Sequence, residues 1–133
     1  MNIGIDIDGA DVKARGQVII DSKDLDYNYK FARDVTGADV IAHGQVIMDS
    51  KDLDYNLVFA RAVKGADIKA HGKIILASGD VDYNSKFMRI RRSDIAAHEA
   101  AINETKLSYC EKFLDDCLDS LKKEKVRIKK KTV

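Results

Sequence analysis

Proline is absent from this 133-residue chain, and cysteine occurs only twice. Because proline interrupts helices and is common in turns, its absence favours helices joined by tight glycine or aspartate turns. Two cysteines are too few for a disulfide framework, and on one helix Cys110 and Cys117 lie roughly 10 Å apart, too far to be bridged. We therefore expect two reduced, unpaired thiols.

Long apolar segments are also missing. No run of 18 apolar residues occurs, which excludes a spanning helix, and the N-terminus lacks the basic-then-apolar order of a signal peptide. We therefore expect a cytoplasmic protein, either bacterial or, for a phage protein, in the host cytoplasm. With 45% hydrophobic and 34% charged residues the chain can bury a core, which excludes a disordered, collagen-like or mucin-like protein.

A repeat of 28 residues is the main signal in the sequence. The unit GADVKARGQVIIDSKDLDYNYKFARDVT occupies residues 9–36, and the next copy, residues 37–64, matches it at 21 of 28 positions. Residues 65–92 match the second copy at 14 of 28 positions. A decayed fourth copy, residues 93–118, retains SDIAAHEAAI and SYCEKFL. The four copies cover most of the chain.

Each unit is predicted to form two short helices, which in the first copy span residues 12–22 and 25–35. An aspartate precedes each first helix and can cap its free amide groups, and the glycine that opens each unit suits the left-handed residue ending the helix before. Another glycine recurs in the middle of the first helix, where it costs about 1 kcal/mol relative to alanine. Its repetition predicts a close helix crossing. The capping aspartates are Asp11, Asp39 and Asp67, and the mid-helix glycines are Gly16, Gly44 and Gly72, with Glu99 at that position in the fourth copy.

One hairpin of this length cannot bury its own apolar face, so neighbouring hairpins are expected to stack. We predict an all-α fold, a short right-handed α-solenoid of four two-helix repeats, 9–36, 37–64, 65–92 and 93–118. Residues 1–8 are expected to form a cap or frayed segment. The sequence GIDIDG, residues 4–9, is not expected to form a strand, because the helical repeat follows at once. Residues 119–133 form a basic extension.

The run YNYKFARDVTGADVIAHG resembles short two-helix tandem repeats found in bacterial and phage-encoded proteins, of a HEAT-like kind with a smaller unit. The resemblance covers about residues 9–118. It implies a helical repeat fold, and its association with phages and mobile elements implies a small inhibitor of a host protein complex such as a defence system.

Two patterns suggest metal sites, and in both cases another interpretation is favoured. Zinc ligands must converge on one ion, whereas equivalent residues of stacked repeats lie about 8 to 10 Å apart. We expect the column of Arg15, His43, His71 and His98 to be partly exposed and packed at the repeat seams, or else to form a ligand-facing stripe. The two aspartates and the asparagine in each DLDYN or DVDYN segment form a DxDxN triplet that resembles the opening of a calcium loop. The later glycine and glutamate of such a loop are missing, so helix capping is favoured.

Positive charge is concentrated in the C-terminal segment. Residues 119–133 contain seven lysines or arginines and two acids. These side chains can neutralise phosphates, so nucleic-acid binding is possible, although a solvated extension or docking to an acidic partner is favoured because no aromatic residues are interleaved. The candidate nucleic-acid-binding residues are Lys122, Lys123, Lys125, Arg127, Lys129, Lys130 and Lys131.

Just before this extension, apolar residues recur at spacings of three and four. They predict a helix of about 20 residues that continues the fourth repeat and seals the apolar end of the stack. A self-pairing seam that forms a homodimer is the alternative to a monomer. The residues of this pattern are Leu107, Cys110, Leu114, Cys117 and Leu121.

No nucleophile, base and phosphate-loop pattern stands out, so we predict neither enzymatic activity nor a cofactor or metal ion. The leading hypothesis is a non-enzymatic module that binds a protein partner through polar side chains repeated along one surface, with no membrane contact. The candidate contact residues are the expected exposed columns Asp26, Asn28, Asp54, Asn56, Asp82 and Asn84, together with Arg89, Arg91 and Arg92.

Overall fold

The structure is a computed structural model that describes the backbone of residues 9–132 and the side chains of residues 9–127. The predicted N-terminal cap, residues 1–8, lies outside the described residues. Throughout the described part, the regular elements are helices, which confirms the all-α class. They are α1 (Gly9–Ser22), α2 (Leu25–Asp34), α3 (Val40–Ser50), α4 (Leu53–Ala62), α5 (Ile68–Ser78), α6 (Val81–Phe87) and α7 (Ile95–Thr132).

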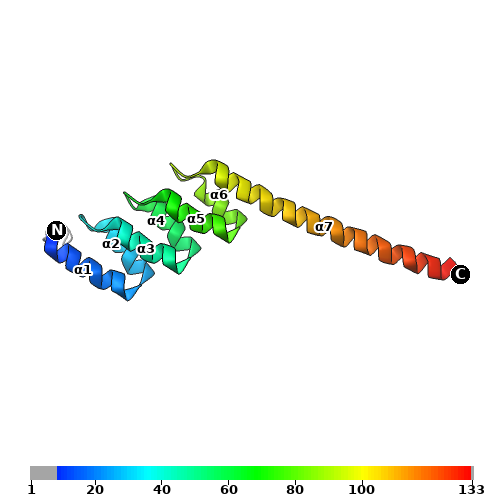
Figure 1. Cartoon of the computed structure of the whole chain (residues 1–133), viewed down its shortest axis with the longest axis horizontal. Coiled ribbons are helices and arrows are strands. Elements are labelled where there is room, and N and C mark those ends of the chain that lie inside the picture. The colour runs from blue at the N-terminus through cyan, green and yellow to red at the C-terminus, as the bar shows by residue number, and fades with distance from the viewer. Residues whose placement is uncertain (1–8, 133) are drawn as a thin grey trace.

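The first six helices form three hairpins that lie side by side in one row (Figure 1). Within the row, α1, α3 and α5 pack along one side, and α2, α4 and α6 pack along the other. Each hairpin also contacts the next through its second helix, α2 against α3 and α4 against α5. The core therefore lies at the seams between successive hairpins.

Two apolar clusters fill these seams. Ile47 and Phe59 are completely buried in the first cluster, together with Ala32 from the preceding hairpin. Ile75 and Phe87 occupy the same repeat positions in the second cluster. Since each seam takes residues from two hairpins, one hairpin cannot complete its own core.

Aspartate side chains cap the helices, as the DxDxN triplets predict. Asp24 accepts a hydrogen bond from the Tyr27 amide at 2.8 Å, and Asp52 and Asp80 cap α4 and α6 in the same way. Asp39 and Asp67 cap α3 and α5, as expected. Asp11 instead lies inside the first turn of α1, which begins at Gly9.

The expected fourth hairpin is wrong, because residues 95–132 form the single helix α7, 38 residues long. In the preceding repeat a turn with Gly79 in the left-handed conformation and the cap Asp80 separates the two helices. The fourth copy has Lys106 and Leu107 near this position, and both favour helix. With no turn or cap, the first helix of the repeat continues.

The prediction that this helix seals the stack is also wrong. Only its first turns pack against α5 and α6, through residues such as His98 and Ile102. From Lys106 to Arg127 every side chain is exposed. Helix α7 therefore projects away from the hairpins (Figure 1).

Candidate functional site

The three asparagines that sequence analysis placed on the binding surface are completely buried, so that expectation is wrong. Nδ2 of Asn28 donates hydrogen bonds to the carbonyl oxygens of Ile19 and Asp24, at 3.0 and 2.7 Å. The Ile19 carbonyl lies in the last turn of α1, where carbonyls lack helical partners, and the Asp24 carbonyl, which also accepts from the Asn28 amide, opens α2. Asn56 and Asn84 repeat both bonds one and two hairpins later. The asparagines therefore join the two helices of each hairpin from inside.

Each asparagine also holds a histidine of the next repeat. Asn28 Oδ1 lies 2.7 Å from His43 Nδ1, and the pairs Asn56–His71 and Asn84–His98 are separated by 2.8 and 2.6 Å. Because the amide group donates to carbonyls, its oxygen accepts, and Nδ1 of each histidine carries the proton. We call these three pairs the asparagine–histidine ladder.

The histidines are completely buried at the seams, and not partly exposed as expected. Removal from water disfavours the imidazolium, which lowers the pKa of His43 and His98 and lowers the pKa of His71 to about 4. Each ring is bonded to a different asparagine in a different seam. The ladder therefore consists of neutral rings that bond each hairpin to the next hairpin or, at the end, to α7.

The repeated mid-helix glycine makes room for this histidine. A Cβ atom added at Gly44 would lie 3.1 Å from His71 Nε2 and 3.2 Å from the Phe59 ring. His71 also stacks on Phe59, with ring centroids 4.8 Å apart. The predicted close crossing is therefore an approach of a histidine and a phenylalanine ring to the helix backbone.

The ends of the repeat array follow the same logic. Arg15 stands at the histidine position of the first hairpin and is exposed, since no described hairpin precedes it. Glu99 stands at the glycine position of α7 and is also exposed, since no later histidine approaches it. The co-occurrence of glycine, asparagine and the next repeat's histidine was the sequence signal for the ladder, and sequence analysis missed it.

Two of the candidate aspartates form a second contact between hairpins, at the surface. The Tyr55 hydroxyl donates to Asp26 at 3.2 Å, and the Tyr83 hydroxyl donates to Asp54. The bond to Asp54 raises the pKa of Tyr83 to about 12. Lysines on the same helices pair with two of the aspartates, Lys30 with Asp26 at 2.7 Å and Lys86 with Asp82 at 3.1 Å. The aspartate column already has partners within the chain.

The candidate arginines, by contrast, gather around two adjoining grooves of about 350 and 540 Å³. Arg89, Arg91 and Arg92, all exposed, lie in the segment that connects α6 to α7. Within residues 9–127, none of them forms an ion pair with a carboxylate, and neither does Arg61 at the end of α4. The basic lining residues are Arg61, Lys64, Lys86, Arg89, Arg91 and Arg92, and apolar residues, among them Ala60, Ile68 and Ile90, complete the walls. We call these the basic grooves.

The backbone at Arg92 is unusual for an arginine. Its φ angle is +69°, in the left-handed region, where residues with a Cβ are disfavoured by roughly 1 kcal/mol or more. At the equivalent turn of the preceding repeat, Gly65 has a φ of +85°. The chain therefore places an arginine beside the grooves at a position where the turn favours glycine.

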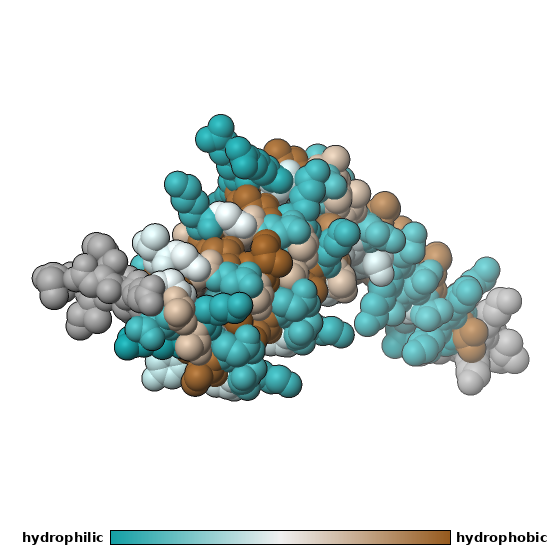
Figure 2. Space-filling model, turned by 60° about the vertical axis from the view of Figure 1, so that its left-hand side comes forward, coloured by the Kyte–Doolittle hydropathy of each residue, from teal (hydrophilic) through white to brown (hydrophobic). Residues whose placement is uncertain are grey.

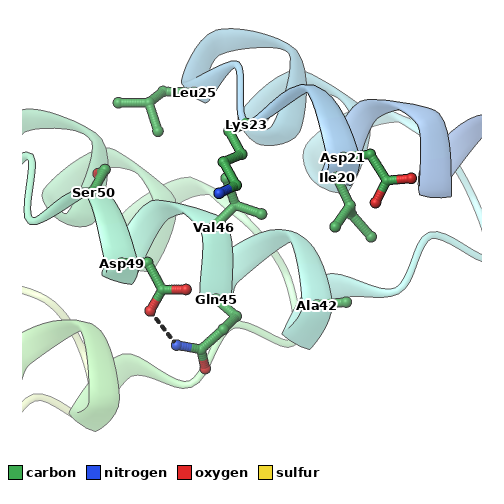
Figure 3. A pocket seen from close by; sticks show the side chains of 9 residues that line it. All are labelled: Ile20, Asp21, Lys23, Leu25, Ala42, Gln45, Val46, Asp49 and Ser50. Atoms are coloured by element: carbon green, nitrogen blue, oxygen red, sulfur yellow. Dashed lines mark hydrogen bonds between the residues drawn. The ribbon is translucent and has the colours of Figure 1, made fainter.

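A third groove, of about 650 Å³, lies between the first two hairpins (Figure 3). Ile20, Leu25 and Val46 supply its apolar lining, and Gln45 donates to Asp49 at 2.8 Å on its rim. Among the described residues of its lining, Lys23 is the only basic one. It is a seam of the stack whose polar groups do not converge on a common point.

The candidate nucleic-acid residues lie on the projecting part of α7. Lys122, Lys123, Lys125 and Arg127 are exposed, and Arg127 pairs with Glu124. The side chains of Lys129, Lys130 and Lys131 lie outside the described part of the structure. Cys110 and Cys117, on the same helix, are exposed free thiols, as expected.

Across the described residues, no group of three or more histidine, cysteine, aspartate or glutamate side chains is placed to hold a metal ion. Among the described helices, none is long and apolar enough to cross a membrane. In comparisons with known proteins, no family model, no curated protein and no solved structure matches this chain.

Proposed function

We propose that this chain is a non-enzymatic protein-binding module, a short right-handed α-solenoid that binds an acidic segment of a partner protein in its basic grooves. One observation carries the proposal: six basic side chains surround two adjoining grooves, and five of them have no carboxylate partner within the described residues. Arginine presents a planar fork of donors that fits a carboxylate, which favours glutamate or aspartate as the bound group.

The apolar residues of the grooves favour a peptide over a bare phosphate chain. Ala60, Ile68 and Ile90 lie among the basic side chains and offer contact to an apolar side chain of the partner. The asparagine–histidine ladder connects the hairpins and so holds the grooves in a fixed shape, which reduces the entropy lost on binding. Arg92 supports the same interpretation, since strained backbone tends to occur at functional positions.

The biological setting is proposed from the sequence resemblance alone. Repeats of this kind in phage-encoded proteins favour a small inhibitor that acts in the bacterial cytoplasm on a host protein complex, such as a defence system. A pull-down from a bacterial lysate with mass spectrometry would name the complex.

Binding of a labelled peptide of alternating glutamate and leucine, followed by fluorescence anisotropy, tests the basic grooves. Replacing Arg61 and Arg91 by serine should weaken binding roughly tenfold or more, because two charge-assisted contacts are lost. The matched control replaces Lys112 and Lys123, which lie on the projecting helix, by serine and removes the same net charge. Equal weakening by both variants would show that only overall charge matters and would contradict the proposal.

Arg92→Gly separates a role of Arg92 in binding from a role in stability, because the two properties should change in opposite directions. Relief of the left-handed strain should raise the free energy of unfolding by about 1 kcal/mol, while loss of the guanidinium weakens peptide binding. A variant that is both more stable and fully able to bind would remove Arg92 from the site.

Nucleic-acid binding by α7 is a second candidate function, favoured by the exposure of Lys122, Lys123 and Lys125 on a helix that projects from the stack. Neutralised phosphates release counterions, so such binding must weaken steeply with salt. Deletion of residues 122–133 should then abolish a mobility shift of a DNA or RNA probe and leave peptide binding intact. If the full chain gives no shift at low salt, this candidate is excluded.

A further inference from the structure

The projecting part of α7 carries an apolar stripe that no described residue covers. Leu107, Leu114 and Leu121 are 62%, 59% and 66% exposed, and Cys110 and Cys117 lie between them at spacings of three and four. We call these five residues the leucine seam. Figure 2 shows apolar side chains recurring among polar ones along this helix.

The leucine seam is not an extension of the face that α7 presents to the hairpins. At about 100° per residue, the seam lies roughly 120° around the helix from buried His98 and Ile102. Its spacing of three and four residues is that of a coiled-coil interface. Since helices without packing are marginal in water, this face fits a second helix with the same repeat of apolar residues.

Charge along α7 indicates what that second helix is. Residues 104–119 contain five acids and two lysines, whereas residues 120–133 contain one acid and seven basic residues. A second copy of α7 that runs in the opposite direction would set each basic segment beside an acidic one. Side-by-side copies in the same direction would repel at their basic ends.

We propose that this chain forms a homodimer in which two α7 helices pair antiparallel about Leu118 through the face that carries the leucine seam. Cys117 and Leu121 of each copy then meet the partner's seam beside the axis, and the rest of the seam lies along residues 122–129 of the partner. Glu111 and Lys125 lie seven residues on either side of Leu118 and flank the seam on the same side. In this pairing Glu111 of each copy faces the partner's Lys125. A parallel pair would keep one attractive flanking contact, Lys106 with Glu111, and would leave Lys125 among like charges.

Sedimentation equilibrium of the full chain over a range of concentrations tests the self-association. We expect a concentration-dependent dimer, which Leu121→Glu should convert to a monomer, because Leu121 meets the partner's seam beside the axis. Tyr109→Glu is the matched control, because Tyr109 is 70% exposed but lies outside the seam. A wild-type monomer at every concentration, or equal loss in both variants, would overturn the proposal. Circular dichroism checks that the hairpins stay folded.

Charge exchange tests the orientation. Glu111→Lys and Lys125→Glu should each raise the dimer dissociation constant about tenfold, because attraction becomes repulsion at both ends of the pair. The double variant should return close to the wild-type value, since antiparallel partners are again complementary. Failure of the double variant to recover would contradict the antiparallel pair.

Oxidative cross-linking provides an independent measurement in the Cys117→Ser variant, where Cys110 is the only thiol. In the antiparallel pair the two Cys110 residues lie about 24 Å apart along the helix axes, too far for a disulfide. In a parallel pair they face each other and cross-link. A covalent dimer under mild oxidation would therefore overturn the antiparallel arrangement, and its absence in a sample shown to be dimeric would support it.

Discussion

The hairpins and the projecting part of α7 use the same helical spacing of apolar residues with opposite results. In the hairpins, polar side chains enter the core and satisfy backbone and side-chain groups there, as Asn56 does for Ile47, Asp52 and His71. In α7, apolar side chains such as Leu114 remain in water. Polarity of a residue type therefore does not decide burial in this protein. The availability of a neighbouring repeat decides it.

Breaking the asparagine–histidine ladder is expected to cause the largest loss of stability, and a matched change on the projecting helix almost none. Asn56→Ala removes two hydrogen bonds to carbonyl oxygens and leaves the Nδ1 proton of His71 without a partner in the core, which should lower the free energy of unfolding by about 4 kcal/mol. Urea denaturation of the full chain measures it. Asn103→Ala, at an exposed position of α7, should change stability by less than about 0.5 kcal/mol. A similar small change for both would show that the ladder is not needed for stability.

Acid should weaken the hairpins before it affects the projecting helix. The folded-state pKa of His71 is about 4, below its ordinary 6.5, so the unfolded chain binds more protons between these values. Stability is therefore complete above about pH 6.5 and is lost as pH falls toward 4, by about 3 kcal/mol for His71 alone. Urea midpoints measured between pH 4 and pH 6.5 test whether stability falls as the pH falls. A flat profile would contradict a neutral, buried ladder.

A smaller loss of stability is expected when the mid-helix glycine, which the buried rings approach, is replaced by alanine. A Cβ at Gly72 would lie 2.9 Å from the Phe87 ring and 3.1 Å from His98 Nε2, so Gly72→Ala must displace buried rings. The gain in helix propensity offsets only part of this strain, and we expect a net loss of about 1 to 2 kcal/mol. Gly9→Ala is the control, since no atom of the described residues lies within 4 Å of its Cβ position. Thermal unfolding distinguishes the two variants. A stabilised Gly72→Ala variant would show that the crossing has room for a methyl group.

The candidate site was predicted only in part. Arg89, Arg91 and Arg92 are exposed, as expected, but their assembly with Arg61 and Lys64 depends on contact between neighbouring hairpins. The asparagines were placed on the wrong side of the chain because asparagine is usually exposed. Nothing within a few residues of Asn28 shows that His43, fifteen residues later, will share its seam.

By itself the sequence determined the repeat, the two helices of the first three units and the aspartate caps of α2 to α6, because these depend on spacing and on hydrogen bonds that span three or four residues. Tertiary structure alone decided the rest. Burial of Asn56 and neutrality of His71 require the next hairpin, and the exposure of Leu114 follows from the absence of one. The local sequence pattern determines which residues form a helix, whereas the neighbouring surface that packs against the helix determines which of its side chains are buried.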